Sequence, residues 1–446
     1  MSGTVTGSLV DLATGPAALP ASARIVARHC LLDWLGVAIA GTSDGAVTAV
    51  VEEALDRDAA GRSPVIGRTE RLGLLDAALA NGVAGHVLDY DDAHQAIRGH
   101  GTAPILPATL ALAERHDLSL QQSLDEFAQG VEACARVSIF LGPAHYLRGF
   151  HTTGTAGTFG AVIACSRLMG LDGEEVHHAI GIAASMSAGL VANFGSMSKA
   201  LNVGRAAMNG LHAARLAARG FTASPCAFEG PGGFVDALGA ERACASALEL
   251  PASGHHLPDT LFKMHASCFG THSAINAALA ARARGATPGR IAAIHLRVPA
   301  GAEQACSIAN PTCGLEVKFS LPFLVAMALH GVDTSDPAVF TDALPARSDL
   351  RSLAERVMLH YEQQAGTAAQ PSQIEIHLAD GRIIAECANA GVPETDLGQQ
   401  QERLETKFAA LATPRLGRRR VARIVPMVLT GEAAVREMLA LCTPDA

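Results

Sequence analysis

The chain has 446 residues, too many for one hydrophobic core, so its length predicts two or three domains. Hydrophobic residues make up 49% of the sequence and charged residues 17%, which is enough apolar material for a large buried interior. The formal net charge of −9 argues against a nucleic-acid surface, which needs clustered Lys and Arg, but is compatible with a local basic pocket for a small anion.

The cysteines and the N-terminal segment exclude several further classes of protein. Ten cysteines are scattered between Cys30 and Cys442 without a C-x-x-C pair, which argues against a zinc ribbon, an iron–sulfur site and a disulfide framework. The segment MSGTVTGSLVDLATG lacks the basic and apolar regions of a signal peptide. Since no apolar stretch of about eighteen residues is free of charges and turn signals, we expect a cytoplasmic protein without a membrane span.

The first two-thirds of the chain has apolar residues at helical spacing, in segments separated by short turns that contain Gly or Pro. The pattern predicts helices at 22–40, 72–88, 104–116, 120–141, 154–169, 174–191 and 204–219. Gly and Ala recur inside these segments. Because Gly costs about 1 kcal/mol relative to Ala in a helix interior, this density predicts helices that cross at close range.

The pattern changes near residue 265. IAAIHLRVP (291–299) alternates as a strand does, and SQIEIHLADGRIIAECANA predicts a hairpin that turns at Asp380-Gly381. A helix is predicted near 347–359, and helical periodicity returns at 399–441. We infer a mainly α protein, with a large all-helical domain at 1–264 plus 396–446 and a smaller α+β lid domain at 265–395. A cleft between two such domains is a usual place for a small-molecule site.

The segment LDYDDAHQAIRGHG crowds carboxylates and histidines into one turn, at Asp89, Asp91, Asp92, His94 and His100. Such groups shift one another's pKa values toward catalytic use. Two other interpretations stay open. The side chains can hold a divalent metal, although their spacing matches no standard motif. They can also cap the next helix or pair with Arg98, which we expect for at least one of Asp91 and Asp92.

Three later segments place titratable groups among apolar residues. His151 precedes a Gly-rich helix start, where free backbone N–H groups favour an anion, although a capping role explains it equally well. Lys199 and Arg205 interrupt an apolar helix, where a lysine either snorkels or binds a substrate carboxylate. Three more groups lie near the domain junction, namely Lys263, His265 and His272.

Together these segments resemble the MmgE/PrpD superfamily over about residues 20–440. The resemblance is carried, in order, by DYDD with a following histidine, GFHTTGTAGTFG, SK…GRAAMNGLHAARLAARGF, GPGGF, FK…C…TH and KFSLP…VA. It implies a helical domain with a smaller lid domain, a homodimer, no cofactor, and a small polycarboxylate substrate bound in the cleft. The family includes 2-methylcitrate dehydratase, cis-aconitate decarboxylase and iminodisuccinate epimerase.

Carried over residue by residue, the resemblance assigns six site residues: Asp89, His100, His151, Lys199, Lys263 and His272. The chain departs from the family pattern at four places. Ala93 stands where Thr is frequent, Gly101-Thr102 follows the key histidine in place of Pro-Ser, Asn202 replaces a histidine, and Phe323 replaces a tyrosine. A phenol can donate a proton and a phenyl ring cannot, so we consider Tyr146 as a replacement donor.

The reactions of the family share proton transfer at a carbon beside a carboxylate. This step needs a base near neutrality and positive charge aimed at the carboxylate. We assign His100 and His151 as the candidate base and acid, with Asp89 orienting or tuning His100. Lys199 and Lys263 are assigned to the substrate carboxylates.

His272 is expected to assist from the lid, and Arg205 and Tyr146 complete the predicted substrate-binding set; we expect no metal. The missing Thr, His and Tyr donors weaken dehydration and decarboxylation more than epimerisation, which needs only reprotonation from the opposite face. We therefore place a cofactor-independent epimerase of a small, iminodisuccinate-like dicarboxylate first. A dehydratase or decarboxylase of a small polycarboxylate comes next, and a non-catalytic carboxylate-binding protein last.

Overall fold

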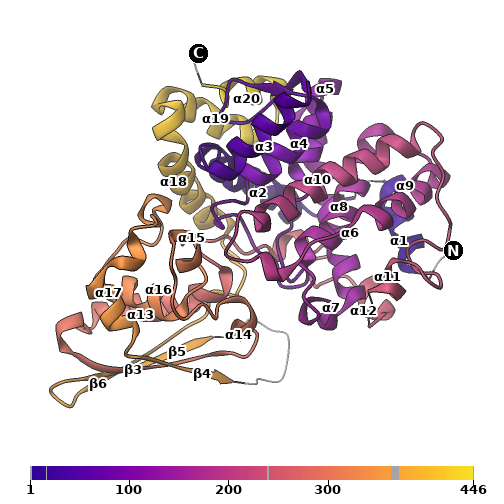
Figure 1. Ribbon diagram of the computed structural model, residues 1–446. Coiled ribbons are helices and arrows are strands. Elements are labelled where there is room, and N and C mark those ends of the chain that lie inside the picture. The colour runs from indigo at the N-terminus through magenta and orange to yellow at the C-terminus, as the bar shows by residue number, and fades with distance from the viewer. Residues whose placement is uncertain (1–2, 17, 239–240, 363–370, 445–446) are drawn as a thin grey trace.

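The computed structural model describes residues 3–16, 18–238, 241–362 and 371–444. In Figure 1 a large helical domain lies at the upper right, and a smaller domain with a sheet along its lower edge lies at the lower left. The fold is mainly α with two domains, as the sequence predicts.

The helical domain is built from both ends of the chain. Its first part contains α1 (Val5–Thr14), α2 (Ala21–Gly41), α3 (Gly45–Asp56), α4 (Leu74–Ala84), α5 (Leu106–His116), α6 (Leu120–Leu141), α7 (Pro143–Leu147), α8 (Thr152–Met169), α9 (Gly173–Met186), α10 (Ser198–Ala217), α11 (Phe234–Ala237) and α12 (Cys244–Leu248). Short antiparallel strands β1 (Ala60–Pro64) and β2 (Arg71–Leu72) lie between α3 and α4. The C-terminal segment adds α18 (Leu397–Leu416), α19 (Arg418–Thr430) and α20 (Val435–Leu441).

The C-terminal helices return to the helical domain because their apolar side chains complete its core. Leu404 and Phe408 of α18 are buried in the same hydrophobic cluster as residues of α2, against which α18 packs. No single helix among the described residues is both long and apolar enough to cross a membrane. The bent pair α2 and α3, which meet at 80°, passes that test by length and composition alone.

The lid domain is a four-stranded sheet covered by helices on one face. Its strands are β3 (Ile291–Pro299), β4 (Val357–Glu362), β5 (Ser372–Leu378) and β6 (Ile383–Ala388), in the order β4-β3-β5-β6. β3 pairs parallel with β4 and antiparallel with β5, which forms the predicted hairpin with β6. The lid helices are α13 (His272–Ala283), α14 (Ala302–Ala305), α15 (Gly314–Val317), α16 (Leu321–His330) and α17 (Ser348–Ala354). Short 3₁₀ turns lie at Val191–Asn193, Leu257–Asp259, Phe269–Thr271, Pro288–Arg290, Pro337–Val339 and Leu344–Ala346.

Most of the predicted elements are present, and the differences have local causes. α10 begins at Ser198 instead of residue 204, which places Lys199 in its first turn. The helix predicted at 347–359 is wrong at its end, because α17 stops at Ala354 and β4 follows. In β4 the exposed Met358 stands between the inward-facing Val357 and Leu359, so three apolar residues follow one another and hide the alternation of the strand. The helix α1 was not predicted, since its glycine and threonine are weak helix formers and packing of Val5 and Leu9 stabilises it.

The glycines inside helices lie where helices cross, as their density predicts. Helix α8 packs between α6 and α10, and it is buried along nearly its whole length. A Cβ on Gly130 of α6 would lie 2.7 Å from the Gly160 carbonyl oxygen of α8, and one on Gly82 of α4 would lie 2.7 Å from the Gly204 Cα of α10. These contacts bring α6 close to α8 and α4 close to α10. The N-terminal ends of α8 and α10 carry His151 and Lys199 of the candidate site.

Replacing Gly210 of α10 with Ala tests this close packing. The added Cβ would lie 2.4 Å from the Ala161 Cβ and 2.7 Å from the Thr158 carbonyl oxygen. We expect Gly210→Ala to lower the free energy of unfolding by about 1–3 kcal/mol, measured by urea denaturation. Gly173→Ala is the control, because a Cβ there meets only the Val10 side chain at 3.5 Å. Equal stability of the two variants would contradict the packing argument.

Candidate active site

A cavity of about 210 Å³ lies where the helical domain meets the lid. Its wall includes charged and imidazole groups, namely Asp89, Arg98, His100, His151 and Lys199. It also includes apolar or weakly polar side chains, namely Ala93, Tyr146, Phe194, Leu261, Cys268 and Phe269. The cavity is thus at the domain junction where the sequence analysis expects a small-molecule site.

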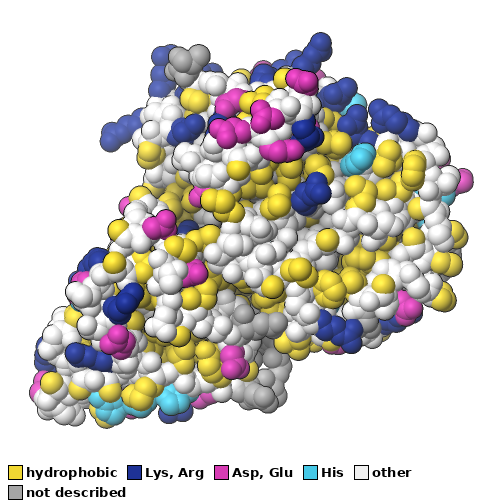
Figure 2. All heavy atoms as spheres, viewed as in Figure 1, with side chains coloured by type: hydrophobic (Ala, Val, Ile, Leu, Met, Phe, Trp, Pro, Cys, Tyr) yellow, Lys and Arg dark blue, Asp and Glu magenta, His cyan; other side chains and the backbone are white. Residues whose placement is uncertain are grey.

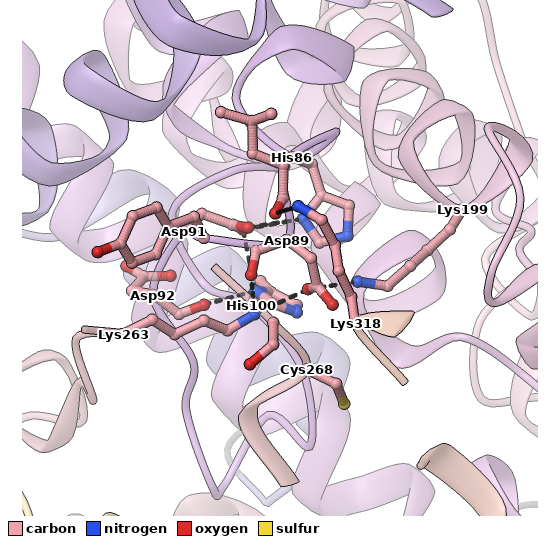
Figure 3. Close-up of polar contacts among 12 residues, drawn as sticks. His86, Asp89, Asp91, Asp92, His100, Lys199, Lys263, Cys268 and Lys318 are labelled. Carbon is pink, nitrogen blue, oxygen red and sulfur yellow. Dashed lines mark hydrogen bonds and ion pairs between the residues drawn. The ribbon is translucent and has the colours of Figure 1, made fainter. Parts of the chain in front are cut away.

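The Asp89 carboxylate is the electrostatic centre of the site. Its Oδ1 lies 2.7 Å from the Lys199 Nζ and 2.8 Å from the Lys263 Nζ, and all three side chains are buried (Figure 3). Burial opposes ionisation of Asp89, but the two ammonium groups outweigh it and hold its pKa well below the usual range. Asp89 also has a φ of 52°, a left-handed conformation that non-glycine residues rarely adopt. The site therefore holds a charged triad on a strained backbone position.

Lysines also bind the backbone of the loop that carries Asp89. Lys263 donates to the Asp89 carbonyl at 2.9 Å, Lys318 donates to the Leu88 carbonyl, and Lys407 donates to the Tyr90 carbonyl at 2.7 Å. Burial lowers the pKa of Lys318 to about 8, with Lys263 and Lys199 adding to the shift against the opposing charge of Asp89. Lys318 was not predicted from the sequence as a site residue, although Lys318 is the lysine of the KFSLP segment that carries part of the resemblance.

His100 is oriented by Asp91 and not by Asp89, the residue that the sequence predicts to orient or tune it. The His100 Nδ1 lies 2.9 Å from the Asp91 Oδ2 and also contacts the Asp92 carbonyl oxygen. Since both neighbours are acceptors, Nδ1 carries a proton and the neutral ring keeps its lone pair on Nε2. Asp91 also accepts from the His86 Nδ1 at 2.9 Å, so one buried carboxylate bridges two imidazoles.

His86 is a further site residue that the sequence analysis missed, although it precedes the DYDD segment by only a few positions. Its ring lies 4.5 Å from the His100 ring and 6.0 Å from the His151 ring, measured between centroids. Burial lowers the pKa of His86 to about 4, with Asp91 opposing and Lys199 and His100 adding to the shift. His86 is therefore neutral near pH 7.

His151 lies at the N-cap position of α8 and has the opposite tautomer. Asn202 Nδ2, 3.3 Å away, donates to the His151 Nδ1, so the neutral ring carries its proton on Nε2. Burial, the positive charge of Lys199 and the neighbouring His86 and His100 rings lower the pKa of His151 well below its usual value. His100 and His151 thus present to the same cavity an Nε2 lone pair and an Nε2–H.

Asp92 has a structural role, although it neither caps α5 nor pairs with Arg98, the roles that the sequence predicts for at least one of Asp91 and Asp92. It accepts from the Thr102 hydroxyl, and the Thr102 N–H is 3.4 Å from its Oδ1. Burial raises the pKa of Asp92 to about 6. The expected partner Arg98 makes no ion pair with it. Instead Arg98 lines the cavity, with a φ of 49° and a buried Nη1 that has no hydrogen-bond partner among the described residues.

Three of the predicted site residues do not line this cavity. Arg205 is exposed on α10, because six residues at 100° each turn it to a different face from Lys199. His272 lines a neighbouring cavity of about 300 Å³ together with His265, Asn276, Asn389, Gln400 and Arg403. Lys263 is fully buried beneath Asp89 and does not line the 210 Å³ cavity, so it positions the carboxylate without facing a ligand.

The predicted replacement donor and two thiols complete the site. Tyr146 lines the cavity as proposed, and burial raises its pKa. Phe323, by contrast, is buried in the lid core and is not part of the cavity wall, so its missing hydroxyl does not leave a gap there. Cys268 lines the cavity and accepts from the Cys306 thiol at 3.4 Å, a contact that lowers the pKa of Cys268.

A resident metal does not fit the ligand groups at this site. His86, Asp89 and His100 offer ligand atoms within 4.8 Å of one another, as do Asp91, Asp92 and His100. However, Asp89 already contacts two ammonium groups, and Asp91 accepts from two imidazoles. A divalent ion here would lie beside two buried positive charges.

The chain belongs to the MmgE/PrpD family of enzymes. The model of the MmgE/PrpD N-terminal domain matches residues 13–247, and that of the MmgE/PrpD C-terminal domain matches residues 265–430. This confirms the resemblance inferred from the sequence.

The relatives are named as decarboxylases. The chain is 28% identical to cis-aconitate decarboxylase of Mus musculus, over 90% of this chain and 85% of the relative. It is 28% identical to the enzyme of that name from Homo sapiens, over 91% and 87%, and 25% identical to that from Aspergillus terreus, over 92% and 89%. These names support a lyase and give no support to the epimerase that the sequence analysis placed first.

Replacing Asp89 with Asn tests the buried charge triad. The change leaves Lys199 and Lys263 without their shared counter-charge, so we expect the free energy of unfolding to fall by about 3–5 kcal/mol in urea denaturation. Glu53→Gln breaks an exposed ion pair with Arg57 and serves as the control that leaves the transition unchanged. An Asp89→Asn protein as stable as the wild type would show that the lysines are not held by this charge.

The buried histidines predict loss of stability in mild acid. Burial lowers the pKa of His145 from 6.5 to about 4, with Arg148 adding to the shift. Between pH 6.5 and 4 the unfolded chain therefore binds more protons than the folded one, and stability falls as pH falls. His29, His86, His94 and His255 have the same shift.

We expect His145→Gln to reduce the slope of unfolding free energy against pH in this window by up to about 1.4 kcal/mol per pH unit. The measurement is urea denaturation at several pH values between 7 and 4. His116→Gln, which replaces an exposed histidine, is expected to keep the wild-type slope. A wild-type stability that does not change across this window would contradict the assignment of neutral buried imidazoles.

Proposed function

We propose that the chain is a carboxy-lyase that removes CO₂ from a small unsaturated polycarboxylate of the cis-aconitate class. The observation that carries the proposal is the composition of the cavity wall. Lys199 and Arg98 provide positive charge, His100 and His151 provide groups for proton transfer, and Phe194, Leu261 and Phe269 provide an apolar surface. The names of the relatives, which cover most of this chain, support the same reaction.

The positively charged side chains of the cavity wall bind the carboxylates of the substrate. Arg98 is half-buried, and its Nη1 is buried without a hydrogen-bond partner among the described residues. A buried N–H donor left unpaired is costly, and a substrate carboxylate would satisfy it. Lys199 faces the same cavity, although part of its charge is neutralised by Asp89. Two carboxylates of one substrate would thus be held by two different cations.

Loss of CO₂ is favoured where a carboxylate leaves water for apolar surroundings, because its charge loses solvation while the CO₂ product is neutral. Phe194, Leu261 and Phe269 provide such surroundings in this cavity. As the carbon–carbon bond breaks, its electron pair stays on the remaining skeleton, conjugated with the alkene and a neighbouring carboxylate. Lys199 and Arg98 stabilise that negative charge.

The electron pair must then take up a proton at carbon. We assign this transfer to His100, which first takes up a proton from solvent on its Nε2 lone pair; the Asp91 carboxylate at its Nδ1–H stabilises the imidazolium that then gives this proton to carbon. His151 stays neutral because of its lowered pKa, and its Nε2–H is available as a hydrogen-bond donor to a substrate carboxylate. His100 recovers its proton from solvent after the product leaves.

Epimerisation of a small dicarboxylate is the second candidate, and one observation favours it. His100 and His151 line the same cavity with opposite tautomers, one with a lone pair and the other with a proton on Nε2. One group could remove a proton from a carbon and the other could return it from the opposite face. This reaction needs neither CO₂ loss nor a leaving hydroxyl.

Proton NMR of the purified protein in D₂O separates these candidates. With cis-aconitate we expect CO₂ release and a decarboxylated alkene that carries deuterium at one carbon. His100→Gln is expected to lower the rate by about 10²–10⁴-fold, and His116→Gln, at an exposed histidine, to leave it unchanged.

The epimerase would be supported and the lyase contradicted by the following result with a single stereoisomer of a dicarboxylate such as iminodisuccinate. Deuterium enters at the α-carbon, a new stereoisomer forms and no CO₂ is released. Ligand binding without turnover or deuterium exchange for any polycarboxylate would contradict both reactions and support the binding protein.

A further inference from the structure

Three histidines gather on the outer face of the lid sheet, away from the cavity. His295 lies on β3, His360 on the adjacent edge strand β4, and His377 on β5 at the other side of β3. On β3 and β5 these positions alternate with buried residues such as Ile294 and Ile376, so the histidines occupy the face turned toward solvent. Figure 2 shows histidine side chains exposed along the lower edge of the lid, where Figure 1 places the sheet.

The His295 and His360 rings are stacked with two nitrogens facing each other. The His295 Nδ1 lies 3.2 Å from the His360 Nε2, and the ring centroids are 5.4 Å apart. Without an ion, such a contact needs one ring to donate a single shared proton. Two imidazole nitrogens bound at 2.0–2.1 Å to one tetrahedral Zn²⁺ ion lie about 3.3 Å apart, which is nearly the separation seen here.

His377 supplies a third imidazole next to this pair. Its ring centroid is 5.2 Å from that of His295, and its Nε2 lies 2.6 Å from the Glu375 Oε1. The carboxylate accepts the Nε2–H, which leaves the lone pair of the neutral ring on Nδ1. A carboxylate that fixes the tautomer of a histidine in this way is the usual outer partner of a zinc ligand.

We propose that the outer face of the lid sheet binds one divalent transition-metal ion of the Zn²⁺ class. His295 Nδ1 and His360 Nε2 are the first two ligands, and His377 Nδ1 becomes the third when its half-exposed side chain turns toward them. Water takes the remaining position. The site is independent of the proposed decarboxylation, because none of its ligands lines the cavity.

The surroundings of this site suit a cation better than the buried cluster at Asp89 does. The neighbouring Arg297 is already paired with Glu362 at 3.4 Å, and Glu375 adds a negative charge on the same face. At Asp89, by contrast, Lys199 and Lys263 occupy the carboxylate that a metal would need. Borderline-soft imidazole ligands also favour Zn²⁺, Ni²⁺ or Cu²⁺ over Mg²⁺ and Ca²⁺.

Isothermal titration calorimetry of the untagged, chelator-treated protein with ZnCl₂ tests the proposal. We expect one Zn²⁺ per chain, with binding weakened at least about tenfold in His295→Gln and in His360→Gln, and to a smaller extent in Glu375→Gln. His116→Gln, which replaces an exposed histidine of the helical domain, is expected to bind as the wild type does. Zn²⁺ should raise the Tm of the wild type and not that of the His295→Gln/His360→Gln double variant.

The lid variants replace exposed or half-buried side chains on the outer face of the sheet, so we expect their circular dichroism and Tm without Zn²⁺ to match the wild type. Absence of Zn²⁺ binding to the wild type would overturn the proposal. So would Zn²⁺ binding that survives in the double variant and is lost in His86→Gln, because that result would place the ion in the buried cluster beside the cavity.

Discussion

The site depends on one buried contact, the Asp89 carboxylate between the ammonium groups of Lys199 and Lys263. Burying three charges costs several kcal/mol per ion, and their mutual attraction offsets that cost only when the geometry is close. The arrangement is therefore a poor source of stability in itself. The contact instead fixes the positions of three parts of the chain relative to one another, because helix α10, the loop after α4 and the segment at the domain junction meet at it.

The backbone around Asp89 is held in the same way by lysines from distant parts of the chain. Lys318 reaches in from the lid, and Lys407 from the C-terminal helix α18, where it also pairs with Asp33 at 2.7 Å. The loop thus has little freedom to move, and its left-handed backbone at Asp89 persists because these contacts over-determine it. A rigid loop fixes Asp91, and Asp91 in turn fixes the tautomer of His100, so the chemistry of the imidazole follows from the packing of the lysines.

Hydrophobic periodicity was enough to predict most of the fold, because the main helices have apolar residues at helical spacing between Gly- or Pro-containing turns, and α6 occupies its predicted residues. It failed where tertiary packing decides the outcome, as at the half-exposed edge strand β4. The resemblance found Asp89, His100, His151 and Lys199, all of which line one cavity. It did not identify His86 or the cavity-lining role of Arg98, and it assigned Lys263 and His272, which do not line this cavity. Arg205, predicted from the residues alone, is exposed. Spacing along a sequence does not say which face a side chain occupies or which of two adjacent cavities it lines.

The 210 Å³ cavity, and not the neighbouring 300 Å³ cavity, is the proposed binding site of the polycarboxylate. The most direct test is a crystal structure of the protein with tricarballylate, a saturated tricarboxylate that lacks the reactive alkene. We expect two carboxylates of the bound tricarballylate to lie within hydrogen-bond distance of Lys199 and Arg98, and its carbon chain to face the His100 Nε2. A ligand bound instead in the cavity lined by His265 and His272, with no contact to these groups, would contradict this proposal.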